Sequence, residues 1–155
     1  MYSSGVYEVY WRGALDCLNQ LIESGVLLGE WDAEKVSHLE PEWFVTRQFD
    51  MLDMRGDLQI RSQDVLFGRH IRIITASHEF IKDGFSGALQ VRRCWIDHHA
   101  FVGSYALLYN CVIGHHAVVS VGSVVSSMLV PPYCMVEGNP ARIMREYREG
   151  RWRKI

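Results

Sequence analysis

The sequence predicts an all-β fold in which short strands wind into a parallel coil behind one N-terminal helix. From about residue 58 the helical periodicity is lost, and short apolar or β-branched stretches alternate with small, polar or glycine-containing segments. Apolar residues also recur six positions apart, at Ile96 and Val102 and again at Ile113, Val119 and Val125. Leu107 or Leu108 lies near the expected step between these two groups, and glycine follows at Gly103 and Gly114.

A six-residue repeat requires a different geometry from the two-residue alternation of an ordinary strand. If every sixth side chain points to a common interior, the chain must turn a corner after each short strand. Three such sides make a triangular coil of about 18 residues. Each coil buries its aliphatic residues only by stacking on its neighbours. A plain β-sandwich of short strands is the alternative.

The elements are expected in a simple order. Residues 6–24 form a helix, because Val6, Tyr7, Tyr10, Ala14, Leu18, Leu21 and Ile22 recur at three- and four-residue steps. Ser4 is a plausible cap before this helix and Gly25 a plausible stop after it. Residues 26–55 are expected to be irregular, or else to form an incomplete first turn of the coil. The coils occupy residues 58–135, and residues 136–155 form a C-terminal turn and tail, all within one domain of residues 1–155.

The bulk properties exclude several classes of protein. The chain has 155 residues, a formal charge of −2, 48% hydrophobic and 22% charged residues, as an ordinary globular domain has. We therefore expect no nucleic-acid partner. No apolar run reaches the roughly 18 residues of a membrane span. The four cysteines are widely spaced without a CxxC pair, which favours reduced thiols and a cytoplasmic location.

An ordered set of motifs resembles the C-terminal half of hexapeptide-repeat sugar O-acetyltransferases, the group of galactoside, maltose, nodulation-factor and colanic-acid acetyltransferases. The motifs are Trp95-Ile96, Val102-Gly103-Ser104, Ile113-Gly114, Gly122-Ser123-Val124-Val125, Pro131-Pro132-Tyr133 and Gly138-Asn139-Pro140-Ala141. Upstream, the segment ITASHEF is similar to the one in which this family keeps its catalytic histidine. The resemblance covers roughly residues 58–146. It implies a left-handed parallel β-helix, and transfer of an acetyl group from acetyl-CoA to a hydroxyl of a sugar or similar small acceptor.

The resemblance implies that His78, in a loop between coils, is the catalytic base. An alcohol is a poor nucleophile at neutral pH, so a base must take its proton while it attacks the thioester. A histidine, whose unperturbed pKa is about 6.5, can accept that proton and pass it to the leaving thiolate. Glu79 is expected to orient the loop or the imidazole, or to be merely exposed. Trp95 is expected to face outward, towards the active-site groove or a neighbouring subunit.

Further residues match the family's coenzyme-binding positions: Ser104, Val121, Gly122, Ser123, Ser126, Arg142 and Arg145. Small residues would line a groove for the pantetheine arm, and the guanidinium groups would meet phosphates. The alternatives are turn chemistry at the coil corners for the serines and exposed charges for the arginines. The resemblance also implies a homotrimer, in which each active site lies between two subunits.

Two histidine pairs, His98-His99 and His115-His116, raise the alternative of a zinc protein similar to γ-class carbonic anhydrases. A catalytic zinc needs three protein ligands and a water. His98 would align with the second ligand of that class, but the third would fall at Gly103. Adjacent side chains at a corner are expected to diverge, so we predict solvent-exposed or interface histidines and no metal. A non-catalytic β-helix scaffold remains the other alternative.

Overall fold

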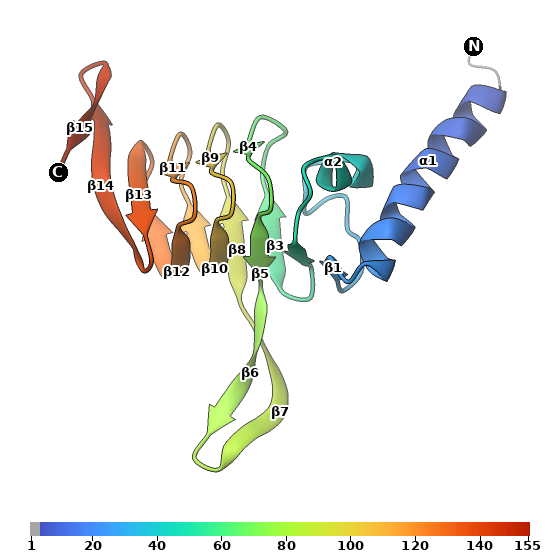
Figure 1. Cartoon of the computed structure of the whole chain (residues 1–155), viewed down its shortest axis with the longest axis horizontal. Coiled ribbons are helices and arrows are strands. Elements are labelled where there is room, and N and C mark those ends of the chain that lie inside the picture. Colours follow the sequence, from blue (N-terminus) through green and yellow to red (C-terminus); the bar gives the residue numbers. More distant parts are fainter. Residues whose placement is uncertain (1–3) are drawn as a thin grey trace.

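The computed structural model describes the backbone of residues 4–155 and the side chains of residues 13–155. The described residues contain far more strand than helix. A row of short strands forms the body, with helix α1 (Ser4–Glu23) at one end and the C-terminal strands at the other (Figure 1). The predicted strand-rich fold behind one N-terminal helix is therefore confirmed.

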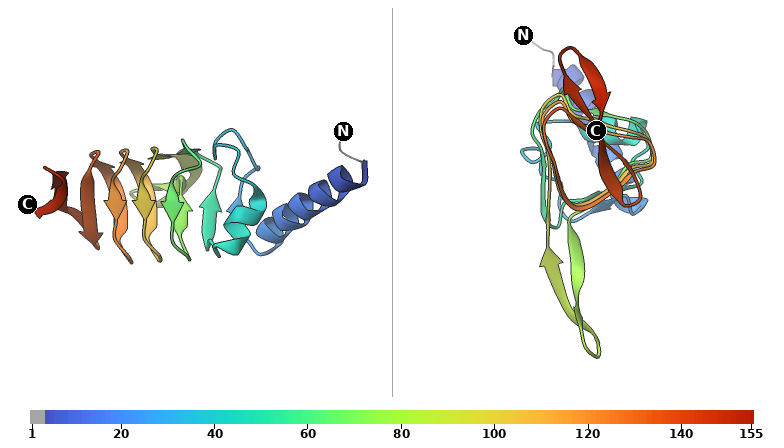
Figure 2. Two further views of the ribbon diagram at one scale, coloured as in Figure 1. Left: turned by 90° about the horizontal axis from the view of Figure 1, so that it is seen from above. Right: turned by 90° about the vertical axis from the view of Figure 1, so that its left-hand side faces the viewer.

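The strands of the body belong to three sides of a coil, which the view along the long axis shows superimposed (Figure 2, right). The first side contains β1 (Leu27–Leu28), β2 (Met51–Asp53), β5 (Arg72–Ile74) and the first halves of β10 (Leu107–Ile113) and β12 (Val124–Val130). The second side contains β3 (Asp57–Ile60), β8 (Arg93–Ile96) and the second halves of β10 and β12. The third side contains β4 (Leu66–Phe67), β9 (Phe101–Val102), β11 (Val118–Val119) and β13 (Cys134–Gly138).

Successive coils pair in parallel, and the pairing fixes the length of one turn. Cys94 pairs with Cys111, Leu107 with Val124, and Phe101 with Val118, each 17 residues apart along the chain. Antiparallel meanders would be expected of the β-sandwich alternative, so this parallel pairing excludes it for residues 58–135. The turn is one residue shorter than the expected 18.

The turn is shortened by one residue at the corner between the first and second sides. The inward side chains, all fully buried, follow one another at steps of six, six and five residues: Ile96, Val102, Leu108, Ile113, Val119, Val125, Val130 and Val136. The five-residue steps fall where β10 and β12 bend, at Asn110 (φ 46°) and Ser127 (φ 51°). A single residue with left-handed backbone turns this corner. The predicted inward residues are therefore confirmed, with Leu108 rather than Leu107 inside.

The N-terminal segment forms a first, looser turn of the coil. Strand β1 pairs with β2 in parallel, and helix α2 (Pro41–Thr46) lies between them in sequence. Five aromatic rings, Trp31, Trp43, Phe44, Phe49 and Phe67, pack edge to face or tilted at this end. This cluster fills the open end of the stack, so the expected incomplete first turn is present and carries a helix.

Helix α1 contacts the coil through its last turns. Leu21 is buried, whereas Ile22, placed on the same predicted apolar face, is half exposed. Gly25 ends the helix with a φ of 76°, as predicted. Ser4 is the first helical residue, and the side chains of Ser4, Val6, Tyr7 and Tyr10 lie outside the described part. Among residues 4–155, no helix combines the length and the apolar character needed to cross a membrane.

The C-terminal segment differs from the expected turn and tail. Strands β14 (Ala141–Arg148) and β15 (Arg151–Lys154) continue the third side as an antiparallel meander on β13. Gly138 pairs with Ala141, so Asn139 and Pro140 form a two-residue hairpin turn that reverses the chain. The backbone hydrogen bonds between β13 and β14 cover the edge of the last coil, where amide groups would otherwise be unpaired.

One element leaves the coil altogether. Strands β6 (Ala76–Ile81) and β7 (Gly84–Val91) form an antiparallel hairpin that projects from the body (Figures 1 and 2). It is inserted between β5 and β8, at the corner between the first and second sides. The predicted loop around His78 is therefore a hairpin, whose two turn residues are Lys82 and Asp83, followed by Gly84 as the first residue of β7.

Candidate functional site

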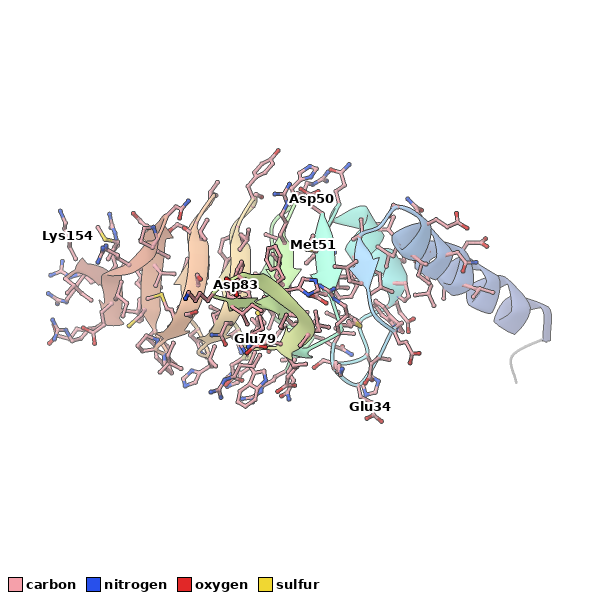
Figure 3. All side chains as sticks on the ribbon, turned by 90° about the horizontal axis from the view of Figure 1, so that it is seen from below. Glu34, Asp50, Met51, Glu79, Asp83 and Lys154 are labelled. Atoms are coloured by element: carbon pink, nitrogen blue, oxygen red, sulfur yellow. The ribbon has the colours of Figure 1, made fainter. Side chains whose placement is uncertain are left out.

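His78 lies on β6 near the base of the projecting hairpin. It pairs with Leu89 of β7, its side chain is exposed, and its ring lies 6.4 Å from that of Phe85. The register shifts between His78 and Phe80, where Glu79 of β6 lies opposite three residues of β7, 86–88, so the extra residues of this β-bulge are on β7. Bulges redirect side chains and are frequent beside active sites. Glu79 is half-buried on this hairpin (Figure 3), so it is not a fully exposed carboxylate.

A buried polar network fixes the base of the hairpin. The carboxylate of Asp53, fully buried, accepts hydrogen bonds from Arg55 Nε (2.9 Å), Arg55 Nη2 (3.0 Å) and the backbone N–H of Thr75 (3.1 Å). The hydroxyl of Thr75 donates to the carbonyl of Asp53 (2.7 Å) and accepts from the N–H of Gly56 (2.9 Å). Thr75, which leads into the hairpin, is thus held to the preceding coil.

The same network sets the protonation state of Asp53. Burial alone would raise the pKa of this carboxyl group, but the hydrogen bonds from Arg55 and Thr75 outweigh it and hold the pKa below its ordinary value. Gly56 must approach the hairpin closely, because a Cβ there would lie 2.0 Å from the carbonyl oxygen of Thr75. Any larger residue would push the hairpin base away from the coil.

A polar cavity of about 420 Å³ lies beside the hairpin base. Its lining residues are Asp57, Val91, Arg92, Arg93, Trp95 and Asn110. The indole N–H of Trp95 donates to Asp57 Oδ2 (2.8 Å), and the guanidinium groups of Arg61 and Arg93 lie 4.6 and 5.0 Å from its ring centre. Trp95 faces outward, as predicted, between the buried Cys94 and Ile96.

A second cavity of about 280 Å³ continues the first along the second side. It shares Arg93 and Asn110 with the first cavity and extends past Cys111, Val112, Ser127, Met128 and Leu129. The two cavities are therefore adjacent, and together they are called the groove beside the hairpin. The hydroxyl of Tyr109 donates to Ser77 Oγ (3.0 Å) and joins the first side to the hairpin strand that carries His78. His78 itself lines neither cavity.

Three of the residues predicted to bind the coenzyme lie together at a different corner, between the third and first sides. Ser104 occupies this corner in one coil, and Val121 and Gly122 occupy it in the next. The N–H of Gly122 donates to the carbonyl of Ser104 (2.9 Å), and Val121 is 71% exposed. Gly122 has a φ of 70° and open space where a Cβ would stand. This corner is thus a small-residue surface open to solvent.

The other predicted coenzyme residues are more dispersed. Ser126 is exposed on the first side, and Arg142 and Arg145 are exposed on β14 at the C-terminal end. Ser123 differs, because it is fully buried at the inward corner position that Ala106 occupies one coil earlier. Its hydroxyl has no hydrogen-bond partner among the described residues. The side chain of Ser123 therefore fills the corner and does not reach a ligand at the surface.

One chain does not bring all the predicted site residues together. His78, Glu79 and Trp95 lie around the corner between the first and second sides, whereas Ser104, Val121 and Gly122 lie at the opposite edge of the first side. Sequence reasoning also missed Asp57, Arg93 and Asn110 in the groove. Asp57 pairs with Arg93 across 36 residues because the hairpin lies between them, and this insertion conceals the repeat.

Comparison of the sequence with protein-family models and with curated proteins finds no match. Among solved structures, a maltose O-acetyltransferase of Clostridium difficile 630 is similar, with 26% identity, a TM-score of 0.52, and coverage of 56% of this chain and 46% of that one. A hexapeptide-repeat acetyltransferase of Vibrio cholerae O1 biovar eltor, solved with acetyl coenzyme A, has 30% identity and a TM-score of 0.51, covering 56% and 48%. The predicted resemblance to hexapeptide-repeat acetyltransferases is confirmed.

This chain spans just under half the length of those structures. A second structure of the Vibrio cholerae protein gives the same relation, with 30% identity, a TM-score of 0.52, and coverage of 56% of this chain and 49% of that one. These similarities lend no support to the carbonic anhydrase alternative.

Proposed function

We propose that this protein transfers an acetyl group from acetyl-CoA to a hydroxyl of a sugar or similar small acceptor. The observation that carries the proposal is the similarity to acetyltransferase structures, one of them solved with acetyl coenzyme A. The groove beside the hairpin adds polar and aromatic side chains suited to a hydroxylated acceptor, among them Asp57, Arg93 and Trp95. Small-molecule sites combine aromatic side chains with a few polar groups in fixed positions.

The proposal includes the finer architecture. Residues 1–155 form a single acyltransferase domain, and the coil of residues 58–135 is a left-handed parallel β-helix. Its support is the parallel pairing every 17 residues and the single-residue corners at Asn110 and Ser127. The cytoplasmic location predicted from the cysteines stays a prediction.

In the proposed reaction His78 is the general base. Its imidazole takes the proton of the acceptor hydroxyl as the oxygen attacks the thioester carbonyl carbon. The C–S bond of the tetrahedral intermediate then breaks, and the imidazolium returns the proton to the coenzyme thiolate. The β7 bulge opposite Glu79 lies beside the His78 side chain, and the Asp53 network holds the strand that carries it. The reaction needs no metal.

The coenzyme is proposed to lie along the corner formed by Ser104, Val121 and Gly122, with Ser126 beside it. Exposed backbone and the absence of bulky side chains at Gly122 let a pantetheine arm approach closely. Arg142 and Arg145 supply cations for its phosphates. Ser123 contributes by filling the corner beneath this surface, because its side chain is buried.

We further propose a homotrimer, because a second chain would join the two halves of the site. The hairpin exposes five apolar side chains to solvent in the single chain: Phe80 (77%), Ile81 (49%), Phe85 (65%), Leu89 (42%) and Val91 (56%). An isolated hairpin is marginally stable in water, and exposed apolar patches of this kind mark interfaces. A neighbouring copy would cover them and would bring its coenzyme corner towards His78.

The experiment is an acceptor screen that reads free thiol released from acetyl-CoA, run beside thermal unfolding with the coenzyme. We expect acceptor-dependent thiol release and a rise in Tm. Coenzyme at a hundred times its Kd should add about 2.7 kcal/mol to the free energy of unfolding. A scaffold would show neither effect. Zinc-dependent hydration of carbon dioxide, with no coenzyme-induced shift, would replace the proposal by the carbonic anhydrase alternative.

A further inference from the structure

Four histidines are stacked at the corner between the second and third sides, away from the hairpin. His98 and His99 occupy this corner in one coil, and His115 and His116 occupy it in the next. The rings of His98 and His115 are parallel within 1° at 5.0 Å, and those of His99 and His116 within 4° at 4.7 Å. The repeat of the coil thus places four imidazoles on one surface.

Within each pair the side chains converge, so the expectation that they diverge at a corner is wrong. The Nδ1 atoms of His98 and His99 lie 3.1 Å apart, and those of His115 and His116 lie 3.0 Å apart. The cause is the backbone, because His99 and His116 have φ values of 57° and 58°. A left-handed residue turns its side chain back towards that of its predecessor.

Three of these histidines can bind one metal ion. Ligand nitrogens of His98, His99 and His116 all lie within 4.8 Å of one another. Tetrahedral zinc with Zn–N bonds of about 2.0–2.1 Å has ligand nitrogens roughly 3.3 Å apart. Small side-chain rotations close the difference, and they are available because His98 and His99 are exposed and His116 is half-buried.

The surroundings of these histidines resemble those of a metal centre. One oxygen of Asp64 accepts a hydrogen bond from the backbone N–H of His99 (2.9 Å), and the other lies 3.1 Å from His99 Nδ1. A carboxylate that holds Nδ1 of an imidazole leaves Nε2 to bind the metal, as is usual around metals. On the other side Tyr133 stacks on His116, with ring centres 4.8 Å apart and an angle of 14°.

We propose that His98, His99 and His116 form a binding site for one divalent zinc-like ion, with Asp64 as the orienting carboxylate. The ion would join two successive coils at a corner remote from the proposed active site. Imidazole nitrogen suits zinc, copper and nickel, whereas magnesium and calcium prefer oxygen ligands. Zinc binding and acetyl transfer use different residues, so either can fail without the other.

The test is titration of chelator-treated protein without a polyhistidine tag with Zn²⁺, by calorimetry, together with thermal unfolding. We expect one zinc per chain, a rise in Tm on binding, and no comparable response to Mg²⁺. Cobalt in place of zinc should give the visible d–d absorption of a nitrogen-ligated site. No heat of binding and no Tm shift with Zn²⁺ would mean that the four imidazoles are only a stacked column, and would overturn the proposal.

Single-residue variants distinguish the proposed metal ligands from the neighbouring histidine. His98→Ala and His116→Asn should each abolish stoichiometric binding, and asparagine suits the left-handed backbone of His116. His115→Ala, which removes a stacked ring but no member of the triad, should keep it, as should His38→Asn elsewhere on the surface. Asp64→Asn should weaken binding about 10–100-fold. The melting temperature of each metal-free variant shows that it is folded, and unchanged affinity in folded His98→Ala and His116→Asn would contradict the assignment.

Discussion

At the residue scale, the buried carboxylate of Asp53 joins the coil to the hairpin that carries His78. It has three side-chain or backbone N–H donors from Arg55 and one from Thr75, all within 3.1 Å. A buried carboxylate is tolerated when its charge is paired and its oxygens are hydrogen-bonded. This residue therefore stabilises the position of the candidate site from beneath, without touching a substrate.

Replacing Asp53 with asparagine should destabilise the fold by about 1–3 kcal/mol at pH 7. The N–H donors of Arg55 and Thr75 would then face a neutral side-chain amide in place of a carboxylate. The pKa of Asp53 is lower in the folded chain than its ordinary value of 3.8. Its stabilisation is therefore complete above that ordinary value and is lost as the pH falls through the lowered folded value. Urea unfolding should show the same difference between wild type and Asp53→Asn at pH 7 and 5, and a smaller one at pH 3. A difference that grows at pH 3 would contradict this role.

How far the sequence predicts individual residues depends on the repeat. Ile113, Val119 and Val125 could be assigned to the interior because each recurs on a six-residue step. Ser123 was expected to line the coenzyme groove, but its side chain is fully buried, and this burial follows only from the 17-residue relation to Ala106. The convergence of His98 and His99 could not be predicted either, because it depends on a left-handed φ that histidine seldom adopts.

At the element scale, each short strand contributes one inward side chain to a column, and Val119 of β11 is fully buried there. Val119→Asp would bury an unpaired charge and should cost more than about 4 kcal/mol, enough to prevent folding. The matched control is Val118→Asp on the same strand, where the side chain points outward and is partly exposed. We expect the control to stay soluble and to melt cooperatively in circular dichroism. Cooperative melting of Val119→Asp near the wild-type temperature would refute the register.

The elements outside the repeat were harder to predict. The hairpin of β6 and β7 was expected as a loop, although Asp83-Gly84 is a turn signal, because its apolar residues do not alternate cleanly with polar ones. The C-terminal strands were missed because charged residues crowd β14, which is exposed at most of its positions. In both cases pairing with a neighbouring strand, rather than local propensity, determines the structure.

At the scale of the whole molecule, the exposed apolar face of the hairpin predicts self-association. Phe80→Ser with Phe85→Ser should shift the protein from trimer to monomer in light scattering at micromolar concentration, because aromatic residues dominate such interfaces. Lys82→Ser, in the turn of the same hairpin, is the control and should leave the mass unchanged. A wild-type protein that is monomeric at this concentration would contradict the proposed assembly.

The most direct test of the proposed function is the turnover of His78→Ala with acetyl-CoA and an acceptor found by the thiol-release screen. His78 is exposed and contributes nothing to the buried column, so the variant should fold, assemble and bind coenzyme as the wild type does. Its kcat should fall by about 10²–10⁴-fold, the usual contribution of a positioned acid–base group. His38→Asn, at an exposed position in the first turn, should keep the wild-type rate. Wild-type turnover in His78→Ala would contradict the central claim that this histidine is the base of an acetyltransferase.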